Sequence, residues 1–288
     1  MAELHSDFNA SMLLRIANKN AIRKCWRDRE ISFGCPANWI HYAQKGNLTT
    51  GDPYECVFSR IPKGTTIDIL DRFGIPLEDN LQRFPDADDP AHEFLRYVPT
   101  ILTPTLCFYS LSHANLNDGI AGWNENKQAM EIHIDKYAQY MEYKTEDIGL
   151  VLIQDIRSFI DELQSQIPLA IKTNGANLTQ ERYYISGREN EALFADIIDY
   201  SKHERFDEFN ESPNPPEEIF WKFPEYRKQA ELRMVIPHWN FKQSFDPKNP
   251  SKYDPSQNYL TVKLPNLQSY AGICIPSENI WEGGLWER

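Results

Sequence analysis

The sequence predicts an α+β fold with a largely antiparallel or mixed central sheet flanked by helices. Segments with the apolar pattern of strands and segments with that of helices follow one another irregularly, without the regular strand–helix–strand order of a doubly wound sheet. The chain has 288 residues, of which 41% are hydrophobic, so it can bury a sizeable core without a metal or a disulfide. We find no internal repeat and expect residues 1–288 to form a single domain.

Strands are expected where apolar residues form short runs or alternate with polar ones. The expected strands are 12–16, 31–33, 54–61, 65–70, 94–98, 105–109, 131–134, 183–186, 231–236, 259–264 and 271–275. The run at 105–109 is almost entirely apolar or β-branched, which predicts a central position in the sheet.

Helices are expected where apolar residues recur at a spacing of three or four. The clearest is 155–166, which we expect to end before Pro168, and the others are 21–29, 135–143 and 189–200. Residues 38–51 are interpreted as a loop or a short helix, 74–93 as a long exposed loop, and the acidic, proline-rich stretch 206–218 as a lid or linker.

Composition and charge bound the classes of function. The formal net charge of −12 opposes non-specific binding to a phosphate backbone, although it leaves room for one local basic pocket. Five cysteines without a CxxC pattern favour reduced thiols over a disulfide framework or a zinc site. No apolar run approaches the ~20 residues that span a bilayer, and the first residues do not resemble a signal peptide, so we expect a cytoplasmic protein without a membrane partner.

The most informative segment is 221–237, where polar and apolar residues alternate into an apolar strand. Side chains two apart in a strand share a face, so Gln229, Glu231 and Arg233 form one polar row. Such a row is either a solvated strand face with a neighbouring Glu–Arg pair or the lining of a site, and the sequence leaves both open.

Gln-x-Glu followed by an apolar strand and a proline resembles the third motif of the ADP-ribosyltransferase fold. The resemblance implies an ADP-ribosyltransferase-like fold and NAD as a substrate, with no metal required. It implies that Glu231 is the catalytic carboxylate and that Gln229 orients the acceptor or water. Because breaking the nicotinamide–ribose bond builds positive charge, a fixed carboxylate suits this chemistry.

The same resemblance assigns roles to two earlier segments. Arg15 precedes the expected 21–29 helix, as the first motif does, and its guanidinium would bind phosphate or ribose. Ser110 and Ser112 follow the 105–109 strand and match the Ser-x-Ser of the second motif, where Ser110 would brace Glu231 or the ribose.

A second resemblance spans most of residues 12–236. Asp52 to Glu55, the Cys-Phe-Tyr-Ser run at 107–110 and the run from Tyr226 to Arg233 are similar to the pattern Asp-x-x-Glu, Cys-Phe-Ser, Tyr-x-x-Glu-x-Glu-x-Arg of a bacterial family without an assigned activity. The chain departs from it at 109, an inserted Tyr, and at 229, a Gln in place of the first Glu. This resemblance supports continuity of the fold more than a particular chemistry, and it associates the chain with bacterial toxins or phage-defence effectors. Tyr226 and Arg233, which lie in its last motif, are also expected to bind the substrate.

Two other classes of function remain open. The polar row would serve equally in a non-catalytic module that binds a nucleotide or a protein. Asp52, Glu55 and Glu231 would make a carboxylate cluster for a metal-dependent nuclease, although Asp52 between Gly51 and Pro53 is also typical of a turn cap. The expected partners are a small-molecule dinucleotide and, for a transferase, a protein or nucleic-acid acceptor.

Overall fold

The computed structural model describes most of the chain. The described residues are 12–46, 52–66, 81–111, 121–124, 126, 129–133, 145–180, 192–200, 217–223, 226, 230–243, 245–246 and 252–283. They form a mixed α+β structure whose sheets are antiparallel, as the sequence predicts.

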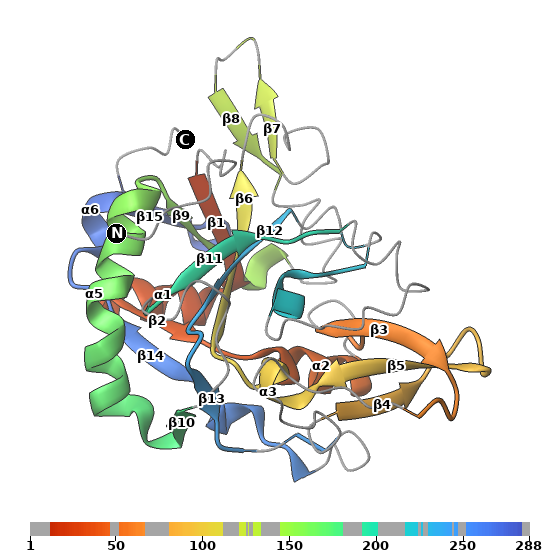
Figure 1. The fold of residues 1–288 in the computed structure, drawn as a ribbon. Helices are drawn as coiled ribbons and strands as arrows, with labels where there is room; N and C mark the ends of the chain where they lie inside the picture. Colours follow the sequence, from red (N-terminus) through yellow and green to blue (C-terminus); the bar gives the residue numbers. More distant parts are fainter. Residues whose placement is uncertain are drawn as a thin grey trace.

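The largest element is a seven-stranded antiparallel sheet, which runs through the middle of the molecule (Figure 1). Its strand order is β11 (Phe194–Ile197), β12 (Glu231–Val235), β6 (Thr105–Leu111), β1 (Met12–Asn18), β9 (Ile148–Ile153), β15 (Ala271–Ile275) and β16 (Ile280–Glu282). The expected strand at 105–109 is central, as predicted. Strand β9 was not predicted, and all six of its residues are buried.

One face of this sheet packs against helices α1 (Lys19–Asp28) and α5 (Ile156–Asn174), the latter on the left of Figure 1. Helix α1 begins after Asn18, whose side chain accepts a hydrogen bond from the backbone N–H of Asn20. It lies so close to β9 that a Cβ at Gly149 would be 3.0 Å from Cβ of Ile22. The short helix α6 (Leu267–Tyr270) and the pair β2 (Glu30–Phe33) and β14 (Leu260–Lys263) complete this side.

A second, three-stranded sheet lies at the lower right of Figure 1, together with two short helices. Its order is β3 (Val57–Pro62), β5 (His92–Tyr97) and β4 (Leu81–Pro85), and the helices are α2 (Pro36–Gln44) and α3 (Val98–Ile101). Two further pairs are β10 (Leu178–Gln180) with β13 (Trp239–Phe241) and β7 (Ala121–Asn124) with β8 (Ala129–Ile132), and the latter projects at the top.

Three sequence predictions are wrong or incomplete. The expected loop 74–93 contains β4, and Asp86 in it is buried and ion-paired with Arg60 at 2.7 Å instead of solvated. The described part of the expected 189–200 helix, residues 192–200, contains strand β11, which pairs with β12. Helix α5 continues past Pro168 to Asn174, because burial of Ile167 and other apolar residues on the same face offsets the proline's cost.

Several predictions lie outside the described residues. These are the helix at 135–143, the strand at 183–186, residues 67–70 of the strand at 65–70, and residues 206–216 of the lid or linker. The described remainder of that last stretch belongs to a 3-10 turn, η6 (Glu217–Phe220).

Two further expectations can be compared with the described residues. All five cysteines are free. Within the ranges given above, no helix combines the length and the apolar character needed to cross a membrane.

Candidate functional site

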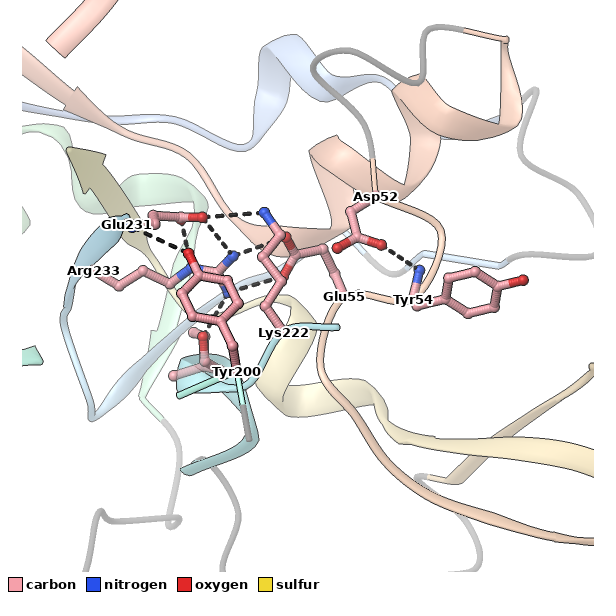
Figure 2. A network of polar contacts seen from close by, with 8 residues as sticks. Asp52, Tyr54, Glu55, Tyr200, Lys222, Glu231 and Arg233 are labelled. Carbon is pink, nitrogen blue, oxygen red and sulfur yellow. Dashed lines mark hydrogen bonds and ion pairs between the residues drawn. The ribbon is translucent and has the colours of Figure 1, made fainter. Parts of the chain in front are cut away.

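Four charged side chains meet on the face of the central sheet that is turned away from α1 and α5. Arg233 lies at the centre of this group and is 0% exposed. Its Nε donates to Oε1 of Glu231 at 2.7 Å, and its Nη1 and Nη2 each donate to one oxygen of Glu55 at 2.8 Å. The guanidinium fork therefore holds one carboxylate bidentately and a second one from the side, as Figure 2 shows.

Lys222 joins the same two carboxylates from a different segment. Its Nζ lies 3.2 Å from Oε1 of Glu55 and 3.1 Å from Oε2 of Glu231. Turn η6 and a hydrogen bond from the Lys222 backbone N–H to the carbonyl of Asp199, at 3.3 Å, position this lysine beside the end of β11. We call Glu55, Lys222, Glu231 and Arg233 the charged cluster; its two cations balance its two carboxylates.

Aromatic side chains surround the charged cluster. The Arg233 guanidinium lies 5.0 Å from the ring centre of Trp39 on α2, and the Lys222 ammonium lies 5.0 Å from that of Tyr226. The hydroxyl of Tyr200 accepts a hydrogen bond of 3.2 Å from the backbone N–H of Glu231. The rings of Trp39 and Tyr226 are half-buried, so the cluster lies near aromatic surface.

The surroundings fix the charge of Glu231. Burial alone would raise the pKa of this carboxyl, but Arg233 and Lys222 outweigh burial and lower the pKa well below its usual range. The two carboxylates likewise raise the pKa values of Arg233 and Lys222 although burial opposes this. All three groups are therefore charged at neutral pH in a site that excludes most water.

Asp52 differs from Glu231, although it lies close to the same cluster. One of its oxygens accepts a hydrogen bond of 2.8 Å from the backbone N–H of Tyr54, and the other, Oδ2, has no hydrogen-bond partner in the described structure. Burial and the negative charge of Glu55 raise the pKa of Asp52 to about 7, although Lys222 lowers it in part. The two carboxyl groups thus differ in protonation at neutral pH.

The backbone is strained beside both carboxylates of the charged cluster. Cys56, next to Glu55, has φ 59°, and Ala230, next to Glu231, has φ 40°. Residues with a Cβ avoid this left-handed region, because the side chain crowds the backbone. Such strain persists only where the surrounding structure imposes it, and it concentrates at functional sites.

The structure does not bring Arg15 and Ser110 to Glu231. Tyr109 of β6 lies opposite Glu231 of β12, whereas the next residue, Ser110, lies opposite Leu13 of β1. Facing residues of an antiparallel pair share one face of the sheet, and successive residues alternate between faces. Ser110 and Arg15 therefore lie on the helix-covered face, and Glu231 lies on the other.

The remaining predicted site residues divide into two groups. Arg233 and Tyr226 belong to the cluster and its rim, and the described members of the polar row, Glu231 and Arg233, are buried instead of solvated. Gln229 and Ser112 lie outside the described residues.

Sequence reasoning missed Lys222 and weighed Glu55 only as a metal ligand. A lysine flanked by Trp221 and Phe223 was a usable signal, since a charge between two apolar aromatic residues needs a buried partner. Among the residues that the structure describes, no three His, Cys, Asp or Glu side chains are arranged to hold a metal ion. Glu55 and Glu231 contact Arg233 and Lys222 instead.

Comparisons with known proteins add no assignment. No family model matches the chain, and neither a curated protein nor a solved structure does.

Proposed function

We propose that the protein consumes NAD, as an ADP-ribosyltransferase or an NAD glycohydrolase, with Glu231 as the catalytic carboxylate in an ADP-ribosyltransferase-like fold. The observation that carries the proposal is a buried Glu231, 8% exposed, whose carboxylate stays ionised between Arg233 and Lys222. A role as a toxin or phage-defence effector belongs to the same proposal and rests on the bacterial resemblance.

The chemistry needs a fixed negative charge. When the bond between nicotinamide and ribose breaks, positive charge develops on the ribose carbon and its ring oxygen. A preorganised carboxylate stabilises this charge more strongly in a site that excludes water than in bulk solvent. Because its pKa is low, Glu231 is anionic throughout the physiological pH range.

Lys222 takes the phosphate-binding role that the sequence assigned to Arg15. Both cations contact the same two carboxylates, but the Lys222 ammonium is a point charge on a four-carbon stem, whereas the Arg233 guanidinium is a planar fork that binds Glu55 bidentately. A pyrophosphate that binds Lys222 draws it away from Glu231. The carboxylate then faces the developing positive charge with one cation fewer beside it.

The strained backbone supports a functional reading of the cluster. Cys56 and Ala230 each adopt a positive φ next to one of the carboxylates. The strain costs about 1–3 kcal/mol at each position, and Cys56 and Ala230 are two of the four residues other than glycine that have a positive φ among the described residues.

A second candidate function is a binding or regulatory module without turnover, which recognises a nucleotide or a protein. The observation that favours it is the pairing of Glu231, whose two oxygens both already contact cations. A carboxylate held in this way exerts a weaker field on a bound ligand, while the aromatic rim around Trp39 and Tyr226 would still bind a planar ring.

Incubation with NAD, followed by measurement of free nicotinamide with and without a chelator, separates the candidates. We expect release that survives chelation and is lost in Glu231→Gln, whereas Glu30→Gln, which removes a carboxylate paired with Lys24 on another part of the molecule, retains it. Thermal melting of each variant verifies that it is folded.

The other outcomes identify the alternatives. Thermal stabilisation by NAD without release of nicotinamide contradicts the catalytic proposal and supports the binding module. Cutting of nucleic acid that depends on magnesium supports the metal-dependent nuclease with Asp52, Glu55 and Glu231.

A further inference from the structure

Asp52 is a buried acid beside the charged cluster, and its carboxyl group forms no ion pair with the part of the chain that the structure describes. It lies in the turn before β3 and is 3% exposed. The turn holds one oxygen through the backbone N–H of Tyr54, and the backbone N–H of Glu55 donates to the carbonyl of Asp52 at 3.4 Å. The position of the carboxyl group is thereby fixed.

The second oxygen of Asp52 points toward the cluster. Figure 2 shows it turned to the carboxylate of Glu55, away from Tyr54. No hydrogen-bond donor in the described structure reaches this atom. A buried oxygen without a donor is costly, and a site that binds a hydroxyl or a water molecule would supply one.

We infer that Asp52 is the proton acceptor of the proposed reaction and takes the proton from the water or acceptor hydroxyl that attacks the ribose. The inference rests on the proposed function. The attacking oxygen forms a bond to the ribose carbon, and the bond from that carbon to nicotinamide breaks. Its electron pair leaves with nicotinamide, the proton passes to Oδ2 of Asp52, and Asp52 later releases it to solvent.

The charged groups around Asp52 suit this role. Burial and the charge of Glu55 raise the pKa of Asp52, whereas Lys222 and Arg233 lower it. Burial lowers the pKa of Arg96, and Asp52 opposes this in part. The resulting pKa of about 7 lies where a general base works best, since it accepts a proton readily and is ionised often enough. The environments of the two carboxyl groups therefore shift their pKa values in opposite directions: Glu231 stays ionised, whereas Asp52 can bind and release a proton near neutral pH.

The test is the pH dependence of nicotinamide release. For the wild-type protein we expect log(kcat/KM) to rise with a slope of one below about pH 7 and to level off above it, because the base must be ionised. Asp52→Asn keeps an oxygen for the Tyr54 N–H and should lower release by about 10²–10⁴-fold with a flat pH profile, while NAD still raises the melting temperature. Asp86→Asn, a change at a buried aspartate paired with Arg60, should leave rate and profile unchanged.

Asp52→Ala with formate gives an independent measurement. Formate supplies a small carboxylate and should restore at least part of the lost rate, which a purely structural role would not allow. Wild-type protein with a pH-independent rate between pH 5 and 9, or Asp52→Asn with the wild-type rate, overturns the role of Asp52 alone. Wild-type protein that releases no nicotinamide overturns the proposed function and this inference with it.

Discussion

Arg233 binds both oxygens of Glu55 through its two terminal nitrogens, each at 2.8 Å, in a site with almost no solvent exposure. Removing one member of such a pair leaves a buried charge without compensation. We expect Arg233→Met to lower the free energy of unfolding by about 3–5 kcal/mol, measured by urea denaturation. Arg27→Met, at an exposed arginine paired with Asp28, is the control and should have little effect.

The double variant of Arg233→Met and Glu55→Met tests the cause. If an unpaired buried charge produces the loss, the second change should restore part of the stability, because the apolar pair needs no compensation. Losses that simply add would contradict the pairing.

Asp52 should make the protein less stable as the pH rises. Its folded pKa of about 7 lies above the value of an exposed aspartate, so the folded state binds the proton more tightly than the unfolded state does. The favourable contribution is complete below pH 4 and is lost as the pH rises to 7. We expect Asp52→Asn to abolish this part of the slope and to be more stable than the wild type at pH 8.5, measured by urea midpoints at pH 5 and 8.5.

Glu231 acts in the opposite direction. Its folded pKa is lowered, so its contribution is present above about pH 4.5 and is lost on acidification. Glu231→Gln therefore serves as the contrasting variant in the same titration: it should remove stability at neutral pH and change the acid limb instead of the alkaline one.

Gly149 should tolerate no side chain. A methyl group there would be 3.0 Å from two carbons of Ile22, so α1 would have to move away from β9. We expect Gly149→Ala to cost about 1–3 kcal/mol of unfolding free energy. Gly175→Ala is the matched control, because its methyl group would meet its neighbours at an ordinary 3.4 Å. An equal loss in both variants would contradict the close packing.

Pro168 should limit the stability of α5. The helix passes through this residue, which lacks the N–H that would bond the preceding turn. We expect Pro168→Ala to raise the melting temperature. The difference in helix propensity between proline and alanine limits the gain in unfolding free energy to about 3 kcal/mol. Leu169→Ala, at a neighbouring exposed position, should not raise it. A lower melting temperature for Pro168→Ala would show that the proline is needed for packing.

The sequence predicted most of the individual strands of the central sheet but not their relation to one another. The alternation in 231–236 placed Glu231 and Arg233 on one face correctly, since that property is local. Whether Arg15 lies on the same face as these two residues depends on how β1, β6 and β12 are aligned. A one-residue shift in register would move Arg15 to the other face of the sheet. The order of three motifs along the chain could not supply that alignment.

Other failures have equally specific causes. β9 is apolar throughout, so it lacked the alternation that identifies a half-buried strand. β11 was taken for part of a helix because pairing with β12 overrode its local pattern. Lys222 could not be assigned to Glu55 and Glu231, because ion pairs between distant segments leave no periodic signal.

The Glu55–Arg233 contact joins residues 178 positions apart in the sequence. During synthesis, the turn that carries Glu55 emerges long before its cation does, and an early chain exposes an unmatched acid where the finished protein has a neutral interior. Long-range contacts of this kind form slowly, since most of the chain must be ordered before they can close. A nascent chain that ends before β12 therefore contains Glu55 and Lys222 but lacks Glu231 and Arg233, so the charged cluster cannot be complete until β12 has been synthesised.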